Sequence, residues 1–292
     1  MTGSVWGKID RKYETVKRNR KRKKIGNEPL VNGDILEFFR TVTGFEPTDY
    51  QKKFLSDQNQ FVVARWARQT GKSLSLAVLC LHTVLSGSGR GVAILAPSLR
   101  QGQLLISRIA SFLRKIPREW IDGRVLKRKL SLVNGSSIEA FPNSPETVRG
   151  LTLGLLIVDE ANYIEDDKAL YDPVVYALAT TNGRFIATST PGTRDSLFYQ
   201  MCTNDEEYGD FSRHHVSFHD ALEPKGPLRK ETVEKLKQQT REDPSRWDRE
   251  MLAEFSSDEE AWLSYRLIES CVDPALEYVP DLNGPKKEER QD

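Results

Sequence analysis

Hydrophobic and polar positions alternate along the chain in blocks of two lengths. Short apolar runs rich in Val, Ile and Leu predict buried strands at 61–64, 91–96, 153–158 and 184–189. Longer segments with apolar residues at helical spacing lie between them and predict helices at 72–86, 98–115 and 168–179. This alternation indicates a parallel sheet with helices on both faces. We therefore predict an α/β fold with a mostly parallel central sheet.

The pattern differs outside this alternating region. Upstream, it predicts a helix at 32–42 and a second helix that Asp49 caps. Within the region, Asn134-Gly135 predicts the turn of a β-hairpin. From Asp195 onward it predicts one strand, at 211–218, and two charged helices, at 229–240 and 244–253. We expect four parts: a basic arm at 1–30, a core at 31–194, a small α-rich lid at 195–256, and an acidic tail or linker at 257–292.

Charge is unevenly distributed in this 292-residue chain. The formal net charge is only +1, yet residues 1–25 hold ten basic residues and two acidic ones. Such an arm either contacts a polyanion or is simply solvated. If it binds DNA, the cluster Lys21, Arg22, Lys23 and Lys24 is the expected contact. The three cysteines are scattered, and the longest apolar stretch is too short to span a membrane. We expect a cytosolic protein.

The segment 61–85 contains the most informative motif. A predicted strand runs into a polar turn, then into Gly71-Lys72-Ser73 and a predicted helix. This arrangement is typical of a loop that binds a nucleoside triphosphate, with backbone N–H groups and the helix N-terminus facing the phosphates. Lys72 would reach the β- and γ-phosphates, and Ser73 would ligate Mg²⁺. Gln69 and Thr70 complete the loop, but Trp66 stands where the full motif has its first glycine.

Two further strands end in side chains suited to phosphate chemistry. The strand at 153–158 runs into Asp159 and Glu160. Asp159 would hold Mg²⁺, and Glu160 would polarise the attacking water as a general base. The strand at 184–189 ends in Thr188, Ser189 and Thr190, whose hydroxyls could relay hydrolysis to the rest of the chain. Carboxyl ends of parallel strands meet at one edge of a sheet, so we expect these groups to lie together.

Three other residues are candidates for contacts with the nucleotide. Gln51 precedes the phosphate loop, where a side-chain amide would pair with adenine; the alternative is an ordinary surface residue. Arg68 lies within the loop and would contact the γ-phosphate. Arg149 precedes the acidic strand and would act on the nucleotide of a neighbouring subunit. For Arg149, a salt bridge or a contact with the DNA backbone remains open.

Together, these motifs resemble the ATPase domain of the large terminase subunit of tailed phages. The resemblance covers about residues 30–256. It is carried by Tyr50-Gln51, Arg68 to Ser73, Ala96-Pro97-Ser98, Arg149-Gly150, Leu156 to Ala161, Thr188 to Pro191, and Trp247 to Phe255. It implies a RecA-like P-loop (ASCE) ATPase that uses ATP and Mg²⁺ to drive double-stranded DNA into a procapsid. It also implies a ring of subunits on the portal protein, a small terminase subunit as partner, and action in the host cytoplasm, although the isolated chain is expected to be monomeric.

Other functions remain open at this stage. Proteins of the family usually continue into a nuclease domain of on the order of 150 residues. Only 37 residues follow Phe255, so we expect no nuclease activity from this chain. A superfamily-2-like helicase or DNA remodeller is the main alternative, because it shares the upstream glutamine and the Asp-Glu strand end. A third possibility is a regulatory or scaffold module that binds ATP without turnover.

Overall fold

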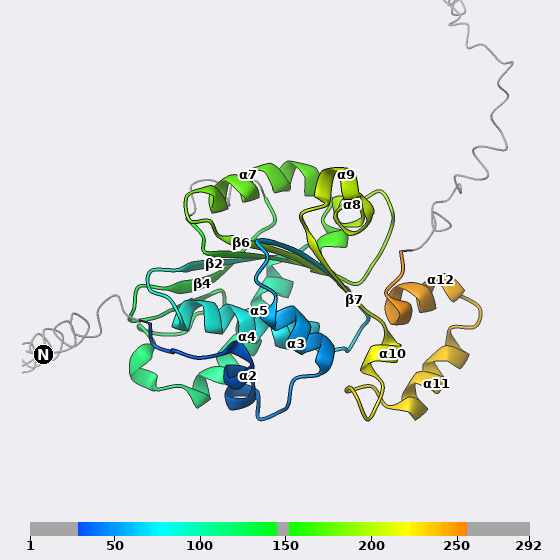
Figure 1. Cartoon of the computed structure of the whole chain (residues 1–292), viewed down its shortest axis with the longest axis horizontal. Coiled ribbons are helices and arrows are strands. Elements are labelled where there is room, and N and C mark those ends of the chain that lie inside the picture. Colours follow the sequence, from blue (N-terminus) through cyan, green and yellow to red (C-terminus); the bar gives the residue numbers. More distant parts are fainter. Residues whose placement is uncertain (1–28, 145–151, 256–292) are drawn as a thin grey trace, which may run out of the picture. The chain divides into compact units, whose positions relative to one another are not determined.

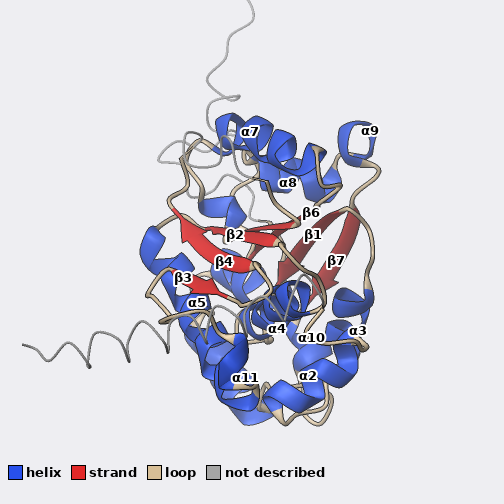
Figure 2. Cartoon of the chain, turned by 90° about the vertical axis from the view of Figure 1, so that its left-hand side faces the viewer, coloured by secondary structure: helices blue, strands red, loops and turns tan. Residues whose placement is uncertain are grey.

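A seven-stranded sheet organises residues 29–144 and 152–255, the two ranges that this computed structural model describes. The strand order is β3-β4-β2-β5-β6-β1-β7, and only the pair β3–β4 is antiparallel (Figures 1 and 2). The α/β class and the mostly parallel sheet are thereby confirmed. The strands are β1 Phe61–Trp66, β2 Gly91–Leu95, β3 Lys129–Ser131, β4 Ser137–Phe141, β5 Leu155–Asp159, β6 Arg184–Ser189 and β7 Ser212–Val216.

The apolar runs form strands because helices cover both faces of the sheet (Figure 1). In β1, Val62, Ala64 and Trp66 point into one core cluster, and Val63 points into the other. Each fully buried Val, Leu, Ile or Phe side chain stabilises the fold by ~1.5–3 kcal/mol. One face carries α2 Ile35–Thr43, α3 Asp49–Ser56, α4 Lys72–Leu85 and α5 Leu99–Phe112. The other carries α7 Asp167–Ala179 and α8 Leu197–Thr203.

The predicted hairpin is confirmed between β3 and β4, with Gly135 in the left-handed conformation at φ 81°. Asn134 has a role that the turn pattern did not indicate. Its buried amide donates to the carbonyl oxygens of Val84 at 2.9 Å and Gly87 at 2.7 Å. The turn is therefore anchored to the end of α4.

Three predicted helix boundaries were wrong. Thr48, not Asp49, caps α3, because a capping box with Gln51 satisfies the first backbone N–H groups. The helix predicted at 98–115 ends at Phe112 and continues as the 3₁₀ turn Leu113–Lys115. The helix predicted at 244–253 is a short α12, Pro244–Trp247, followed by the π-helical turn Asp248–Leu252.

The C-terminal part has its own small apolar cluster, formed by Phe218, Val233, Trp247 and Met251. Three of its helices are α9 Asp205–Tyr208, α10 Phe218–Ala221 and α11 Lys230–Gln239, of which only α11 was predicted. Other 3₁₀ turns span Arg118–Trp120 and Ala161–Tyr163. None of the helices in the described ranges is long and apolar enough to cross a membrane.

Candidate active site

The loop between β1 and α4 has the geometry of a phosphate-binding loop. Gln69 and Gly71 both have left-handed backbone, with φ 61° and 91°. A Cβ atom at position 71 would lie 2.8 Å from Gln51 Nε2, so glycine is required there. Thr70 Oγ1 donates to the carbonyl oxygen of Ala67 at 2.7 Å and closes the loop. The first N–H groups of α4 have no helical partners and suit an anion.

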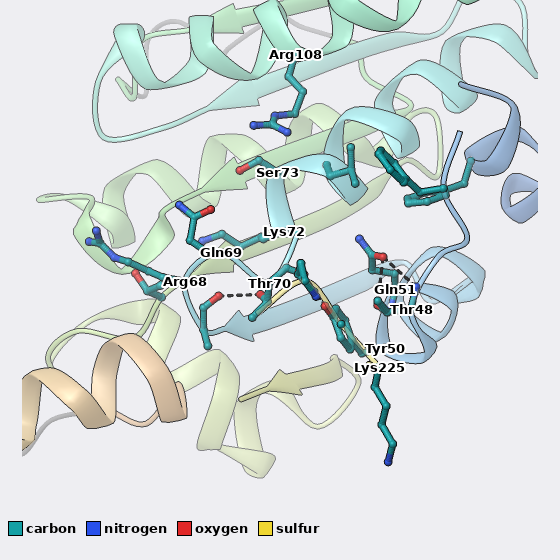
Figure 3. A pocket seen from close by; sticks show the side chains of 18 of the residues that line it. Thr48, Tyr50, Gln51, Arg68, Gln69, Thr70, Lys72, Ser73, Arg108 and Lys225 are labelled. Carbon is teal, nitrogen blue, oxygen red and sulfur yellow. Dashed lines mark hydrogen bonds between the residues drawn. The ribbon is translucent and has the colours of Figure 1, made fainter. Parts of the chain in front are cut away.

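A cavity of about 1040 Å³ opens over this loop (Figure 3). Its volume suits a nucleoside triphosphate. The walls come from α3, α5, the end of β5, the tip of β6 and a C-terminal turn. The lining includes every residue of the predicted nucleotide-binding set, together with Glu160 and Thr190: Gln51, Arg68, Gln69, Thr70, Gly71, Lys72 and Ser73.

Lys72 forms an ion pair with the carboxylates at the end of β5. Its Nζ lies 2.8 Å from Glu160 Oε1 and 3.8 Å from Asp159 Oδ1. The Lys72 and Asp159 side chains are only 10% and 14% exposed, so water screens this pair poorly. The two motifs are 88 positions apart in the sequence, and the fold places them in contact.

The tip of β6 holds the two carboxylates in place. Thr188 Oγ1 donates to Asp159 Oδ1 at 2.8 Å, and Ser189 Oγ donates to Glu160 Oε2 at 3.3 Å. The backbone N–H of Thr190 donates to the same Glu160 oxygen at 3.4 Å. Glu160 itself has φ 54°, a left-handed backbone that a non-glycine residue adopts only where its surroundings enforce it.

The two carboxylates differ in acidity. Burial raises the pKa of Asp159, the charge of Glu160 adds to this, and Lys72 opposes it. Burial alone would also raise the pKa of Glu160, but the charge and hydrogen bond of Lys72, with the bonds from Thr190 and Ser189, together hold that pKa below its ordinary value. Glu160 is therefore the ionised member of the pair near neutral pH.

Gln51 lies beneath the phosphate loop with both ends of its amide engaged. Oε1 accepts hydrogen bonds from the backbone N–H of Thr48 at 3.0 Å and from its hydroxyl at 3.1 Å. Nε2 donates to Ser75 Oγ at 3.1 Å. Gln51 thus joins α3 to α4 and forms part of the cavity wall. Its predicted contact with adenine stays a prediction.

Arg68 contacts the C-terminal segment. Its guanidinium pairs with the Glu250 carboxylate, and its backbone N–H donates to the Glu250 carbonyl oxygen at 2.9 Å. Next to it, Arg65 pairs with Glu254 at 2.7 Å. The phosphate loop is therefore tied to the π-helical turn, a contact that the sequence pattern did not predict. Figure 3 shows Arg68 on the far side of the loop from Tyr50.

The sequence pattern placed Tyr50 on the apolar face of α3 and gave Trp66 no role. Trp66 is 1% exposed, and its ring meets those of Tyr50 and Phe54 edge-on, with centroids 5.3 Å apart in both pairs. The Tyr50 hydroxyl donates to the carbonyl oxygen of Thr70 at 2.8 Å. Trp66 thus supports the aromatic residue that holds the phosphate loop. An aromatic residue in place of the first glycine was the available signal.

Other predicted residues are less constrained or lie elsewhere. The Ser73 hydroxyl lines the cavity and has no hydrogen-bond partner within the described ranges. Two residues that were not predicted, Arg108 of α5 and Lys225, also line it (Figure 3). Arg149 and the basic cluster 21–24 lie outside the described residues.

Comparison with known families gives the decisive observation. The family model described as "Terminase large subunit, T4likevirus-type, N-terminal" matches residues 65–270. This match covers well over half of the chain, and it includes the phosphate loop, the β5 carboxylates and the tip of β6. The chain belongs to the terminase large-subunit family. It is therefore the ATPase of a viral DNA-packaging motor, and this function is favoured over a helicase.

Solved structures show the same fold. The large terminase ATPase domain of Thermus phage P74-26 is similar over 77% of this chain and 100% of that chain, with 21% identity and a TM-score of 0.63. The HK97 bacteriophage large terminase is similar over 76% and 55%, with 15% identity and a TM-score of 0.62. The large terminase of a thermophilic bacteriophage, in complex with ATP-gamma-S, is similar over 72% and 53%, with 11% identity and a TM-score of 0.59. The RecA-like ATPase fold is thereby confirmed.

Proposed function

We propose that this terminase chain hydrolyses ATP with Mg²⁺ and converts each turnover into movement of double-stranded DNA into a procapsid. The observation that carries the proposal is the placement of Glu160. It lies at the end of β5, 2.8 Å from the phosphate-loop lysine, and the tip of β6 hydrogen-bonds its other oxygen. One carboxylate therefore connects the nucleotide cavity with the strand that leads to the C-terminal part.

The chemistry assigned to this chain is positioning and electrostatic stabilisation. Incoming phosphates attract Lys72 away from Glu160, because the triphosphate carries more negative charge than one carboxylate. Lys72 then lies against the β- and γ-phosphates. The carboxylate that it releases accepts a proton from the water that attacks the γ-phosphate.

The residues predicted to hold Mg²⁺ have suitable donor atoms. Both hydrogen bonds to the Asp159 carboxylate fall on Oδ1, from Thr188 Oγ1 and the Glu160 N–H, which leaves Oδ2 available. Ser73 contributes a hydroxyl that lines the cavity. One carboxylate and one hydroxyl, with water and phosphate oxygens, are the donors that Mg²⁺ usually takes at an ATP site. When bound, the ion would neutralise charge that develops on the phosphates.

Thr188, Ser189 and Thr190 are the proposed coupling elements. All three bond to a β5 carboxylate, and they lie on the strand next to β1. A change in the charge at Glu160 during hydrolysis alters these bonds first. Movement at the tip of β6 would then reach the segment that follows it.

Two roles concern the nucleotide itself. Arg68 would exchange Glu250 for the γ-phosphate when ATP is bound, which loosens the contact between the phosphate loop and the C-terminal segment. Gln51 would offer the second hydrogen of its Nε2 group to adenine. Both assignments are supported by the position of these side chains in the cavity wall.

The partners follow from family membership. We propose double-stranded DNA, the portal protein, a small terminase subunit and a ring of copies of this chain docked on the procapsid in the host cytoplasm. Within the ring, Arg149 would reach the nucleotide of a neighbour. The basic arm, with Lys21, Arg22, Lys23 and Lys24, would contact the DNA backbone.

The test is ATPase activity measured against chain concentration, with and without double-stranded DNA and portal. An assembled motor predicts that turnover per chain rises with concentration and rises again with DNA. Constant turnover per chain would indicate a monomeric hydrolase instead. Nucleotide binding without turnover under every condition would identify a non-catalytic module.

A further inference from the structure

Four cationic side chains line the nucleotide cavity, and two of them have acidic partners. Lys72 is paired with Glu160 and Asp159, and Arg68 is paired with Glu250. The other two, Arg108 and Lys225, have no ion pair within residues 29–144 and 152–255. A cavity for a triphosphate needs positive charge that is free to face it, and these two side chains provide it.

The helix that carries Arg108 is firmly placed. Ser98 caps α5 through a capping box with Gln101. At Gly102 a Cβ atom would lie 3.1 Å from the Ala140 side chain, so the helix approaches β4 closely. Leu105, Ile106, Ile109 and Phe112 bury the opposite face. Gln101 and Arg108, two turns apart, share the face that lines the cavity.

Figure 3 shows the direction of the Arg108 side chain. Its guanidinium extends from α5 toward Ser73, on the opposite side of Ser73 from Tyr50 and Lys225. Ser73 is the residue proposed to meet the metal between the β- and γ-phosphates. The terminal phosphate therefore lies at the Arg108 end of the cavity, and the base lies toward Tyr50.

We infer that Arg108 binds the terminal phosphate of the nucleotide held by its own subunit. It would add a second cation in cis, beside Lys72 and from the opposite wall. A guanidinium suits this task, since its planar N–H groups can bond to two phosphate oxygens at once and it stays charged at every working pH. The inference rests on the proposed function, because it requires ATP to occupy the cavity.

Binding of ATPγS and ADP to the full chain, in the presence of Mg²⁺, tests this inference without relying on turnover. Arg108→Ala should weaken ATPγS binding about tenfold or more and leave ADP binding within about twofold. Arg108→Lys should fall between, because a point charge replaces the planar group. Arg100→Ala is the matched control. Arg100 lies exposed on the same helix outside the cavity lining, and its loss should change neither affinity.

The other outcomes are distinct. If the unaltered chain bound neither nucleotide, the proposed function and this inference would both be overturned. If Arg108→Ala bound both nucleotides as the unaltered chain does, or weakened both equally, only the inference would be overturned. A loss confined to concentrations at which copies of the chain associate would also overturn it, because Arg108 would then serve a neighbouring subunit.

Discussion

Lys72 Nζ and Glu160 Oε1 lie 2.8 Å apart in a cavity wall that is largely shielded from water. The cation proposed to bind phosphate and the carboxylate proposed to act as the base therefore neutralise each other. Substrate has to separate them before chemistry begins. This relationship links nucleotide binding to the activation of Glu160, and it explains why neither residue can be replaced without affecting the other.

Replacing Lys72 is the first test of that link. Lys72→Ala should reduce affinity for ATPγS at least tenfold and lower turnover further, since the phosphates lose a charge-assisted contact. Isothermal titration and a phosphate-release assay would measure the two effects. Lys53→Ala, on the exposed side of α3, is the control. ATPγS binding that survived Lys72→Ala unchanged would argue against this loop as the phosphate site.

Trp66 should be essential for stability although it occupies a motif glycine position. Trp66→Ala should lower the free energy of unfolding by ~3–5 kcal/mol, because it leaves a cavity beside Tyr50 and Phe54. Trp66→Phe keeps most of the ring and should cost less than about 1.5 kcal/mol. Urea unfolding measures both. Equal stability of all three proteins would contradict the packing role.

Gln51 has a structural role in the described contacts and a proposed role in base recognition, and two variants separate them. Gln51→Ala and Thr48→Ala each remove the capping box of α3 and should each cost ~1 kcal/mol of stability. Only Gln51→Ala should also reduce the preference for ATP over GTP. Competition binding with the two nucleotides provides the measurement. If the preference is the same in both variants, Gln51 has no contact with adenine.

Glu250 should restrain Arg68. Glu250→Gln weakens the ion pair, so Arg68 becomes free to face the γ-phosphate, and affinity for ATPγS should rise about two- to fivefold. Glu242→Gln, on an exposed turn, is the control. Unchanged or weaker ATPγS binding in Glu250→Gln would show that the pair does not compete with the nucleotide.

Asp57 should make stability depend on pH at the acidic end. Burial would raise the pKa of Asp57, but hydrogen bonds from Ser212, Asn59 and His214 lower it below the ordinary value. Its stabilising effect is therefore present above the unfolded-state pKa near ~3.9 and is lost as pH falls through the lower folded-state pKa. Asp57→Asn should lower the urea midpoint at pH 6 and flatten its fall toward pH 3. Glu234→Gln is the control, and an identical pH profile for Asp57→Asn would contradict this account.

Periodicity was enough to predict the sheet and most of the strands that carry the site. The runs at β1, β5 and β6 are apolar because both faces are covered, and their carboxyl ends must meet in a parallel sheet. Contacts between distant segments were beyond reach. Neither the pairing of Arg68 with Glu250 nor the Tyr50 bond to Thr70 leaves a periodic signal, since both depend on tertiary packing. The capping box of Thr48 and Gln51 was visible in the sequence, but Asp49 obscured it.

The central claim is that Glu160 activates the attacking water while Lys72 and the phosphate loop bind the nucleotide. Glu160→Gln keeps the size and most hydrogen bonds of the side chain but removes the base, and exposed Glu165→Gln serves as its control. Single-turnover hydrolysis and ATPγS binding should be measured on the same preparations, with DNA and portal present. We expect Glu160→Gln to bind ATPγS within about threefold of the unaltered chain and to hydrolyse ATP at least 100-fold more slowly. Hydrolysis at an unchanged rate in Glu160→Gln would contradict the account.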